Sequence, residues 1–157
     1  MATTYKELQS FLDQGGFRYS FTAEGYILTG FGEMEFYRDV DQKARLGVLM
    51  ILEEGGSYLK MICPRLYVYD GKRHAGDVFQ SFLMLNYWTH LIQFEYDDRD
   101  GEFRASIELP LEDGNLTYNQ LARCLSSLAY LIDRIDPLVR KTLREGGIHI
   151  PHKSIQH

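Results

Sequence analysis

Apolar and polar residues alternate with two different periods along this chain, and the periods distinguish predicted helices from predicted strands. Spacings of three and four predict one helix after Thr4 and a long one after Thr117. Glu7 and Gln120 stand three residues beyond these threonines, which is the spacing of a capping box at a helix start. The apolar stripe of the long helix comprises Leu121, Leu125, Leu128, Ile132, Ile135, Val139 and Leu143.

Glycine and proline mark where these two helices end or bend. Gly15 and Gly16 end the first, and Gly146 and Gly147 end the last. Pro137 either kinks the long helix or begins a second segment, because proline lacks the amide donor and crowds the preceding turn.

A period of two predicts strands between the helices. Residues 17–22, YILTGF (26–31) and EMEFYR (33–38) are predicted as extended pieces, followed by a hairpin over 44–70 that turns at 53–57. Pro64 predicts an edge, a bulge or a bend in the second arm of this hairpin. A last pair, 94–96 and 103–109, flanks a turn at 97–101.

A middle helix is predicted over residues 78–90, with Asp77 as its N-cap and Gln80 three residues on. This segment is apolar nearly all round, which is typical of a buried helix. The pattern therefore predicts a single α+β domain over 1–147, with the order α-β(several)-α-β-β-α and a loosely ordered tail over 148–157. The sheet is expected to be mostly antiparallel, with the helices on one face.

Composition and charge narrow the class of protein. Hydrophobic residues make up 45% of the chain and charged residues 25%, with a net charge of −5 that disfavours nucleic acid as a partner. The apolar run 46–52 is far shorter than the ~20 residues that span a bilayer, and the N-terminus has no pattern of a secretory signal. Cys63 and Cys124 lie far apart, which favours a reducing cytoplasm.

Three motifs suggest ligand chemistry, and each is better explained without it. The acids of DDRDG (97–101) lack a calcium loop's ligands at its first and last positions, so a turn is predicted there. GFGE (30–33) has Glu35 where a dinucleotide motif needs its third glycine. His149, His152 and His157 fall in the predicted tail. No metal or cofactor is expected.

The hairpin over 44–70 is apolar on both faces, and this is the main functional signal. If Leu46, Val48 and Met50 face the helices, alternation points a second apolar set away from them. Three helices can cover one face of such a sheet but not both. A partner-binding patch is therefore predicted, although a terminal segment of the chain could also cover it; the patch comprises Leu49, Ile51, Tyr58, Ile62, Tyr67 and Tyr69.

Two functions remain open on these residues. The first is a non-enzymatic binding module, a homodimer whose patch contacts its twin or an extended protein segment. The second is a small enzyme or ligand-binding protein with a cavity enclosed by a curved sheet, for which Glu35, Tyr37 and His90 are the candidate polar groups because they interrupt apolar surroundings.

Three linked segments resemble the bacterial YbjN-type family, which often carries the label of a sensory transduction regulator. They are LMLNYW (83–88), the hairpin FEYDDRDGEFRASIELPLEDG (94–114), and LTYNQLARCLSSL (116–128) with DRIDP (133–137). The resemblance implies an α+β domain with the fold of type III secretion chaperones and a homodimer. It implies no catalytic residues.

Overall fold

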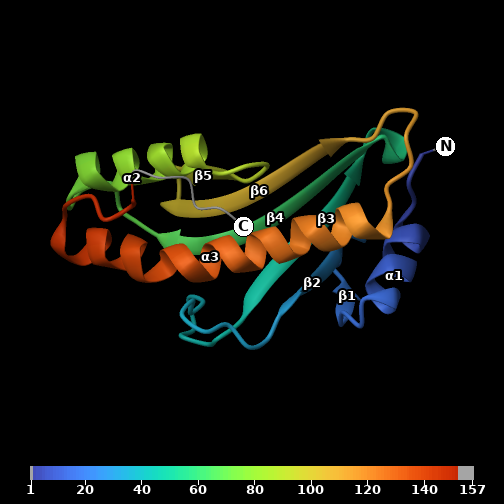
Figure 1. Ribbon diagram of the computed structural model, residues 1–157, viewed down its shortest axis with the longest axis horizontal. Coiled ribbons are helices and arrows are strands. Elements are labelled where there is room, and N and C mark those ends of the chain that lie inside the picture. The colour runs from blue at the N-terminus through green and yellow to red at the C-terminus, as the bar shows by residue number, and fades with distance from the viewer. Residues whose placement is uncertain (1, 152–157) are drawn as a thin grey trace.

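The computed structural model describes residues 2–151 and contains one six-stranded antiparallel sheet in the order β1-β2-β3-β4-β6-β5 (Figure 1). Its strands are β1 (Tyr19–Phe21), β2 (Ile27–Phe31), β3 (Leu46–Glu53), β4 (Tyr58–Val68), β5 (Gln93–Asp97) and β6 (Glu102–Pro110). The helices are α1 (Tyr5–Gln14), α2 (Ala75–Trp88) and α3 (Tyr118–Glu145), and a short 3-10 turn (Glu54–Gly56) joins β3 to β4. The predicted α+β class and order of elements are confirmed.

Both capping boxes predicted from the sequence are present. The Thr4 hydroxyl accepts the Glu7 amide at 3.2 Å while the Glu7 carboxylate accepts the Thr4 amide at 2.7 Å. Thr117 and Gln120 make the same reciprocal pair at the start of α3. That helix continues through Pro137 as one element of 28 residues, so no second segment begins at the proline.

The middle helix differs from its prediction in two ways. It begins at Ala75 after His74, whose backbone is left-handed, and Asp77 lies in the first turn instead of capping it. The Asp77 carboxylate accepts the amide of Gly147 at 2.7 Å, so it anchors the segment after α3. The helix is also only half buried, because Leu83 and Tyr87 face solvent.

The segment 33–38 is not a strand, contrary to its alternating pattern. It belongs to an irregular loop over 32–45 that connects β2 to β3. Its amides are bonded to a carboxylate on α3 instead of a neighbouring strand. Alternation alone therefore misled the prediction, since a strand needs a partner ladder.

The turn predicted for DDRDG is confirmed. Asp97 accepts the Gly101 amide at 2.9 Å and also bonds Arg99. Gly101 has φ 74°, and a Cβ at this position would lie 2.3 Å from the Tyr69 carbonyl oxygen. Only glycine fits this contact, since the backbone of Tyr69, directly after β4, approaches the turn so closely.

The three helices share one hydrophobic core on a single face of the sheet, as predicted. Leu8 and Leu12 of α1, Val78 and Phe82 of α2, and most of the α3 stripe are buried in it. Figure 1 shows α3 lying lengthwise along the sheet, with α2 toward the β5 side and α1 toward the β1 side. Within residues 2–151, the opposite face carries no helix.

The predicted tail begins too early in the sequence. Ile150 is only 3% exposed and belongs to the core. The His149 ring lies 3.0 Å from the Gly146 carbonyl oxygen and so helps to hold this segment in place. The domain therefore extends to at least residue 150, and residues 152–157 of the predicted tail lie outside the described residues.

Candidate functional site

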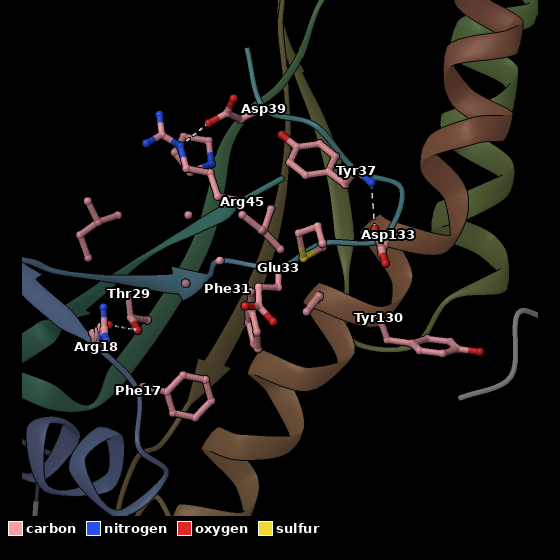
Figure 2. A pocket seen from close by; sticks show the side chains of 18 of the residues that line it. Phe17, Arg18, Thr29, Phe31, Glu33, Tyr37, Asp39, Arg45, Tyr130 and Asp133 are labelled. Atoms are coloured by element: carbon pink, nitrogen blue, oxygen red, sulfur yellow. Dashed lines mark hydrogen bonds and ion pairs between the residues drawn. The ribbon is translucent and has the colours of Figure 1, made fainter. Parts of the chain in front are cut away.

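A groove of about 1300 Å³ lies at the β2–β3 end of the sheet (Figure 2). It is bordered by residues 15–18, by strands β2 and β3, by β4 at Pro64 and Arg65, by the loop 32–45 and by α3 near Tyr130. Its apolar lining comprises Phe17, Leu28, Phe31, Met34, Val40, Leu46, Pro64, Ala129 and Tyr130. The loop 32–45 is thus one wall of the groove, and what holds the loop also shapes the groove.

Asp133 of α3 anchors the middle of this loop. Its carboxylate accepts three successive backbone amides, from Glu35 at 3.2 Å and from Phe36 and Tyr37 at 2.8 Å each. Figure 2 shows Asp133 beside Tyr37 at this point of the wall. Charge-assisted bonds of this kind fix the loop backbone without any strand pairing.

A buried polar cluster lies one helical turn further along α3. Asp136 is 3% exposed and accepts the Tyr67 hydroxyl at 2.9 Å and the Arg140 guanidinium at 3.0 Å. Arg140 also donates to the Arg38 carbonyl at 2.6 Å and lies 5.3 Å from the centre of the Tyr67 ring. The cluster therefore ties the loop, β4 and α3 together.

Burial dominates the proton affinities of this cluster. It raises the pKa of Asp136 above 3.8 despite the neighbouring Arg140 cation, and it raises the pKa of Tyr67 well above 10.0. Burial likewise raises the pKa of Tyr37, whose hydroxyl donates to the Leu66 carbonyl at 3.4 Å. Both tyrosines stay protonated at neutral pH, so their hydroxyls act as hydrogen-bond donors.

The far end of the loop is closed by its own charges. Asp39 accepts the amides of Asp41 and Lys43 at 2.9 Å each and pairs with the Arg45 guanidinium. The hydrogen bond from the Lys43 amide is the largest cause that holds the pKa of Asp39 below its usual value, and the bond from Arg45 adds to it. This carboxylate stays ionised at neutral pH and forms part of the rim of the groove.

Aromatic rings and an arginine lie together beside the groove. The guanidinium of Arg134 lies 5.4 Å from the Tyr130 ring centre and 6.0 Å from that of Phe36. Both rings are substantially exposed. Tyrosine and arginine are the residue types most enriched at the energetic centres of protein interfaces.

Two glycines face each other across the strands that floor the groove. Gly30 of β2 pairs with Gly47 of β3. Gly30 is required by the fold, because a Cβ there would lie 2.0 Å from the Leu46 carbonyl oxygen. Gly47 is different: it is exposed, and a Cβ there would meet only Leu28, at 3.8 Å. Glycine within a strand often marks a place where another molecule approaches the backbone.

Leu28 connects the groove to the face of the sheet that no described helix covers. It lines the groove and lies opposite Leu49, which in turn lies opposite Ile62, so three apolar side chains form one row across β2, β3 and β4. Leu28 is 40% exposed and Leu49 partly exposed, whereas Ile62 is covered by its neighbours. We call Leu28, Leu49, Ile51, Tyr58 and Ile62 the outer patch.

Charged residues border the outer patch on one side. Tyr58 donates to Glu108 at 2.7 Å, and Lys60 lies 3.4 Å from the same carboxylate and 3.7 Å from Glu53. The hydrogen bond from the Tyr58 hydroxyl is the main cause that lowers the pKa of Glu108, and the positive charge of Lys60 lowers it further. An apolar centre with a charged rim is the arrangement that interaction surfaces show.

Tyr67 and Tyr69 do not belong to this patch, contrary to the prediction. The β4–β6 register shifts between Cys63 and Tyr67, around Pro64, as a β-bulge does. The bulge adds two residues to β4, and an even number preserves the alternation, so both tyrosines stay on the face of Leu59, Met61 and Cys63 and lie in the core. Their hydroxyls bond Asp136 and the Arg73 carbonyl. The irregularity predicted at Pro64 is present, but the prediction placed the two tyrosines on the wrong face of the sheet.

The residues proposed for an enclosed catalytic cavity are not brought together. Tyr37 is buried and lines the groove, Glu35 is exposed, and His90 is exposed in the turn after α2. Cys63 and Cys124 are both free and buried, and burial raises the pKa of each thiol. The groove itself is open to solvent, not enclosed by the sheet.

Within the described residues, no group of three His, Cys, Asp or Glu side chains is placed to hold a metal ion. Of the three histidines named above, His149 bonds the backbone, while His152 and His157 lie outside the described residues. No helix described by the structure has the length and apolar character needed to cross a membrane.

Sequence reasoning missed Asp133, Asp136 and the aromatic cluster around Arg134. A signal for Asp136 was present, because an acid stands beside Ile135 and Val139 on the apolar side of the helix. Nothing local identifies Asp133, whose partners are nearly a hundred residues away in sequence.

A scan of protein-family models and a search of curated proteins found no match to this sequence. Solved structures do match. YbjN from E. coli, described as a candidate transcription regulator, aligns with a TM-score of 0.61 and 11% identity over 87% of this chain and 94% of its own. The chain has the YbjN fold.

A second structure supports the same assignment. An uncharacterized protein from Methanothermobacter thermautotrophicus aligns with a TM-score of 0.53 and 10% identity over 88% of this chain and 97% of its own. The resemblance drawn from the sequence segments is thus confirmed for the fold. Since one fold carries many activities, the YbjN fold by itself assigns no function.

Proposed function

We propose that the protein is a non-enzymatic binding module that holds an extended segment of another protein along the groove and across the outer patch. The observation that carries this proposal is Leu28, which joins the groove to an apolar row on a sheet face that no described helix covers. Exposed apolar surface that is continuous over several residues usually marks an interaction site.

The size and shape of the groove favour a protein segment over a small molecule. Small-molecule pockets enclose most of their ligand and hold roughly 300–1,000 Å³. This groove has about 1300 Å³ and is open along one side. Val40 and Tyr130 line the groove and expose apolar surface, so a partner would contact side chains from the loop and from α3.

The chemistry of the site fits binding better than catalysis. Two of the carboxylates that line the groove are engaged: Asp39 pairs with Arg45, and Asp133 accepts backbone amides. Tyr37 is held protonated by burial. We place the protein in the cytoplasm, where its buried free thiols stay reduced.

The proposal is tested by photo-crosslinking in the native host. A photoreactive phenylalanine at Leu28 is expected to give discrete crosslinked products of higher mass, and the same probe at Lys141, exposed on α3, is expected to give none. Mass spectrometry of the products then identifies the bound segment. If Leu28 gives no product beyond those seen at Lys141, the proposed client surface is wrong.

Gly47→Val offers a test that leaves the fold intact. The site is exposed and has room for a side chain, and valine favours extended backbone more than glycine does. We expect the free energy of unfolding to stay the same or rise by about 0.5 kcal/mol, while the Leu28 crosslinks disappear because the new side chain fills the floor of the groove. Denaturant unfolding and crosslinking on the same variant separate the two effects. Undiminished crosslinks in a folded Gly47→Val protein would contradict close approach of a partner at this glycine.

A further inference from the structure

Three exposed arginines lie around the part of the groove that borders α3. Arg18 lines the groove from the segment after α1, and Figure 2 shows it on a different wall from Tyr130 of α3. Arg123 and Arg134 are seven residues before and four residues after Tyr130, so all three share one face of the helix. Within residues 2–151, none of these arginines forms an ion pair with a carboxylate. We call Arg18, Arg123 and Arg134 the arginine border.

The surface of α3 beside the groove is cationic, although the chain as a whole has a net charge of −5. Residues 114–132, which include the first half of α3, contain a single charged residue, Arg123. Two of the three acids of α3 are already engaged, Asp133 with loop amides and Asp136 with Arg140. The exposed side of the helix next to the groove therefore presents positive charge without a matching carboxylate.

The opposite end of the groove is different, because its charges compensate one another. Asp39 and Asp41 both pair with Arg45, and all three line the groove. A chain lying in the groove thus meets compensated charge at the loop end and uncompensated cations where it passes Tyr130.

Arg134 is held in position before any partner binds. Its guanidinium lies 5.4 Å from the centre of the Tyr130 ring and 6.0 Å from that of Phe36. Packing on aromatic rings leaves the N–H groups at the edge of the guanidinium plane available for a carboxylate. Less side-chain entropy is then lost when such a carboxylate binds.

We propose that the segment held by the groove is acidic where it crosses α3, with carboxylates that pair with the arginine border. This inference rests on the proposed function, in which the apolar groove holds the rest of the segment. Arg123 and Arg134 are about 16 Å apart along the helix axis. Two carboxylates four residues apart on an extended chain face the same way and are separated by about 13 Å, so long arginine side chains can reach both.

An acidic protein segment fits this surface better than a nucleic acid does. A duplex carries one negative charge per roughly 1.7 Å of its length, so its phosphates would also meet Glu33 and Glu35, which are exposed on the loop. A protein segment places carboxylates at a few positions only and can offer apolar side chains to the exposed rings of Phe36 and Tyr130. The partner is therefore a protein.

Crosslinking in the native host tests the charge of the bound segment. A photoreactive phenylalanine at Ser126, which is exposed between the two arginines of α3, is expected to capture the same protein as the probe at Leu28. Mass spectrometry is expected to find two or more Asp or Glu residues close in sequence to the residue captured at Ser126. A captured segment without such acids, or a product that nuclease removes, would overturn the inference.

A synthetic peptide with the captured sequence measures what its acids contribute. Replacing its Asp and Glu by Asn and Gln is expected to weaken binding to the wild-type protein about fivefold, the effect of two exposed ion pairs. The variant Arg123→Gln/Arg134→Gln is expected to bind both peptides equally, and added salt is expected to reduce the difference on the wild type. Fluorescence anisotropy measures each dissociation constant. Equal binding of the two peptides by the wild-type protein would contradict the pairing.

Matched charge reversals separate this inference from the proposed function. Arg123→Glu/Arg134→Glu is expected to reduce the Leu28 crosslinks about fivefold or more while circular dichroism shows an intact fold. Lys141→Glu/Arg144→Glu makes the same change of charge on α3, beginning about 10 Å beyond Arg134 along the axis, which is a Debye length at 0.1 M salt. This second pair is expected to leave the crosslinks unchanged. Leu28 crosslinks that survive both pairs would refute the arginine border and leave the client groove intact, whereas their absence from the wild type would refute both proposals.

Discussion

Asp136→Ala is expected to lower the free energy of unfolding by about 3 kcal/mol, the low end of the range for breaking a buried ion pair. The substitution leaves the Tyr67 hydroxyl and the Arg140 guanidinium without their shared acceptor inside the core. The low end applies because Arg140 keeps 31% of its side chain exposed, so water can solvate part of the stranded charge. Urea or guanidinium unfolding of the two proteins measures the difference.

Two further variants show which bond matters. Asp136→Asn keeps an acceptor for Tyr67, so its loss is expected to be smaller than that of the alanine variant. Tyr67→Phe alone removes one hydrogen bond, and in a double-mutant cycle with Asp136→Ala a coupling of about 1 kcal/mol is expected. A cycle with no coupling would show that the hydroxyl is not bound to this carboxylate in solution.

The titration of Asp136 gives the cluster a pH dependence of known sign. Because burial raises its pKa above 3.8 in the folded state, the folded chain holds this proton more tightly than the unfolded chain. The stability that this group contributes is therefore fully present below pH 3.8 and is lost as the pH rises through the raised folded value. The stability of the wild type relative to Asp136→Asn is expected to fall from acidic toward neutral pH. A difference that grows over that range would contradict the assignment.

Asp133→Ala is the second substitution with a large expected effect, about 2 kcal/mol of unfolding free energy together with local opening of the loop 32–45. A hydrogen bond to a charged group contributes about 1.5–3 kcal/mol, and Asp133 accepts three, but water can reach two of the amides and replaces part of the loss. The amides of Glu35, Phe36 and Tyr37 lose their acceptor. Hydrogen exchange at these three positions is expected to accelerate well beyond the change expected from global stability alone.

Matched variants distinguish the anchor from a general loss of stability. Asp133→Asn keeps one carbonyl acceptor and is expected to protect part of the loop, whereas Asp136→Ala is expected to destabilise the whole protein without specific exchange at residues 35–37. If the three amides exchange no faster in Asp133→Ala than in a variant of equal stability, the carboxylate does not anchor the loop. Because the loop is one wall of the groove, a confirmed anchor also predicts weaker client crosslinking at Leu28.

Both substitutions act on α3, which has a structural role and a role in shaping the groove. One side of the helix contributes the stripe that fills the core, from Leu121 to Val139. Asp133 and Arg140 reach across to the loop, at Tyr37 and Arg38, and position it against the end of the sheet. The DRIDP segment quoted for the family resemblance thus contains both of the acids that hold the groove in shape.

Features set by neighbours in the chain could be read from the sequence. The capping boxes at Thr4 and Thr117 join residues three apart, and the turn at Gly101 is made by five consecutive residues. The bare face was also predictable, since it follows from the number of helices available to cover a sheet. Local geometry and residue counts contain this information because they do not depend on how distant segments meet.

Tertiary structure alone decided the facing of Tyr67 and Tyr69, the path of residues 33–38 and the existence of the groove. The bulge of β4 against β6 inserts two residues and so keeps the two tyrosines on the core face, whereas a bulge of one residue would have turned them outward. The amides of Phe36 and Tyr37 bond the Asp133 carboxylate, although the alternating pattern of 33–38 had predicted a strand. The groove needs segments near residues 17, 28, 40 and 130 to meet. Contacts between segments so far apart in sequence are determined by tertiary packing, and the local sequence of each segment does not specify them.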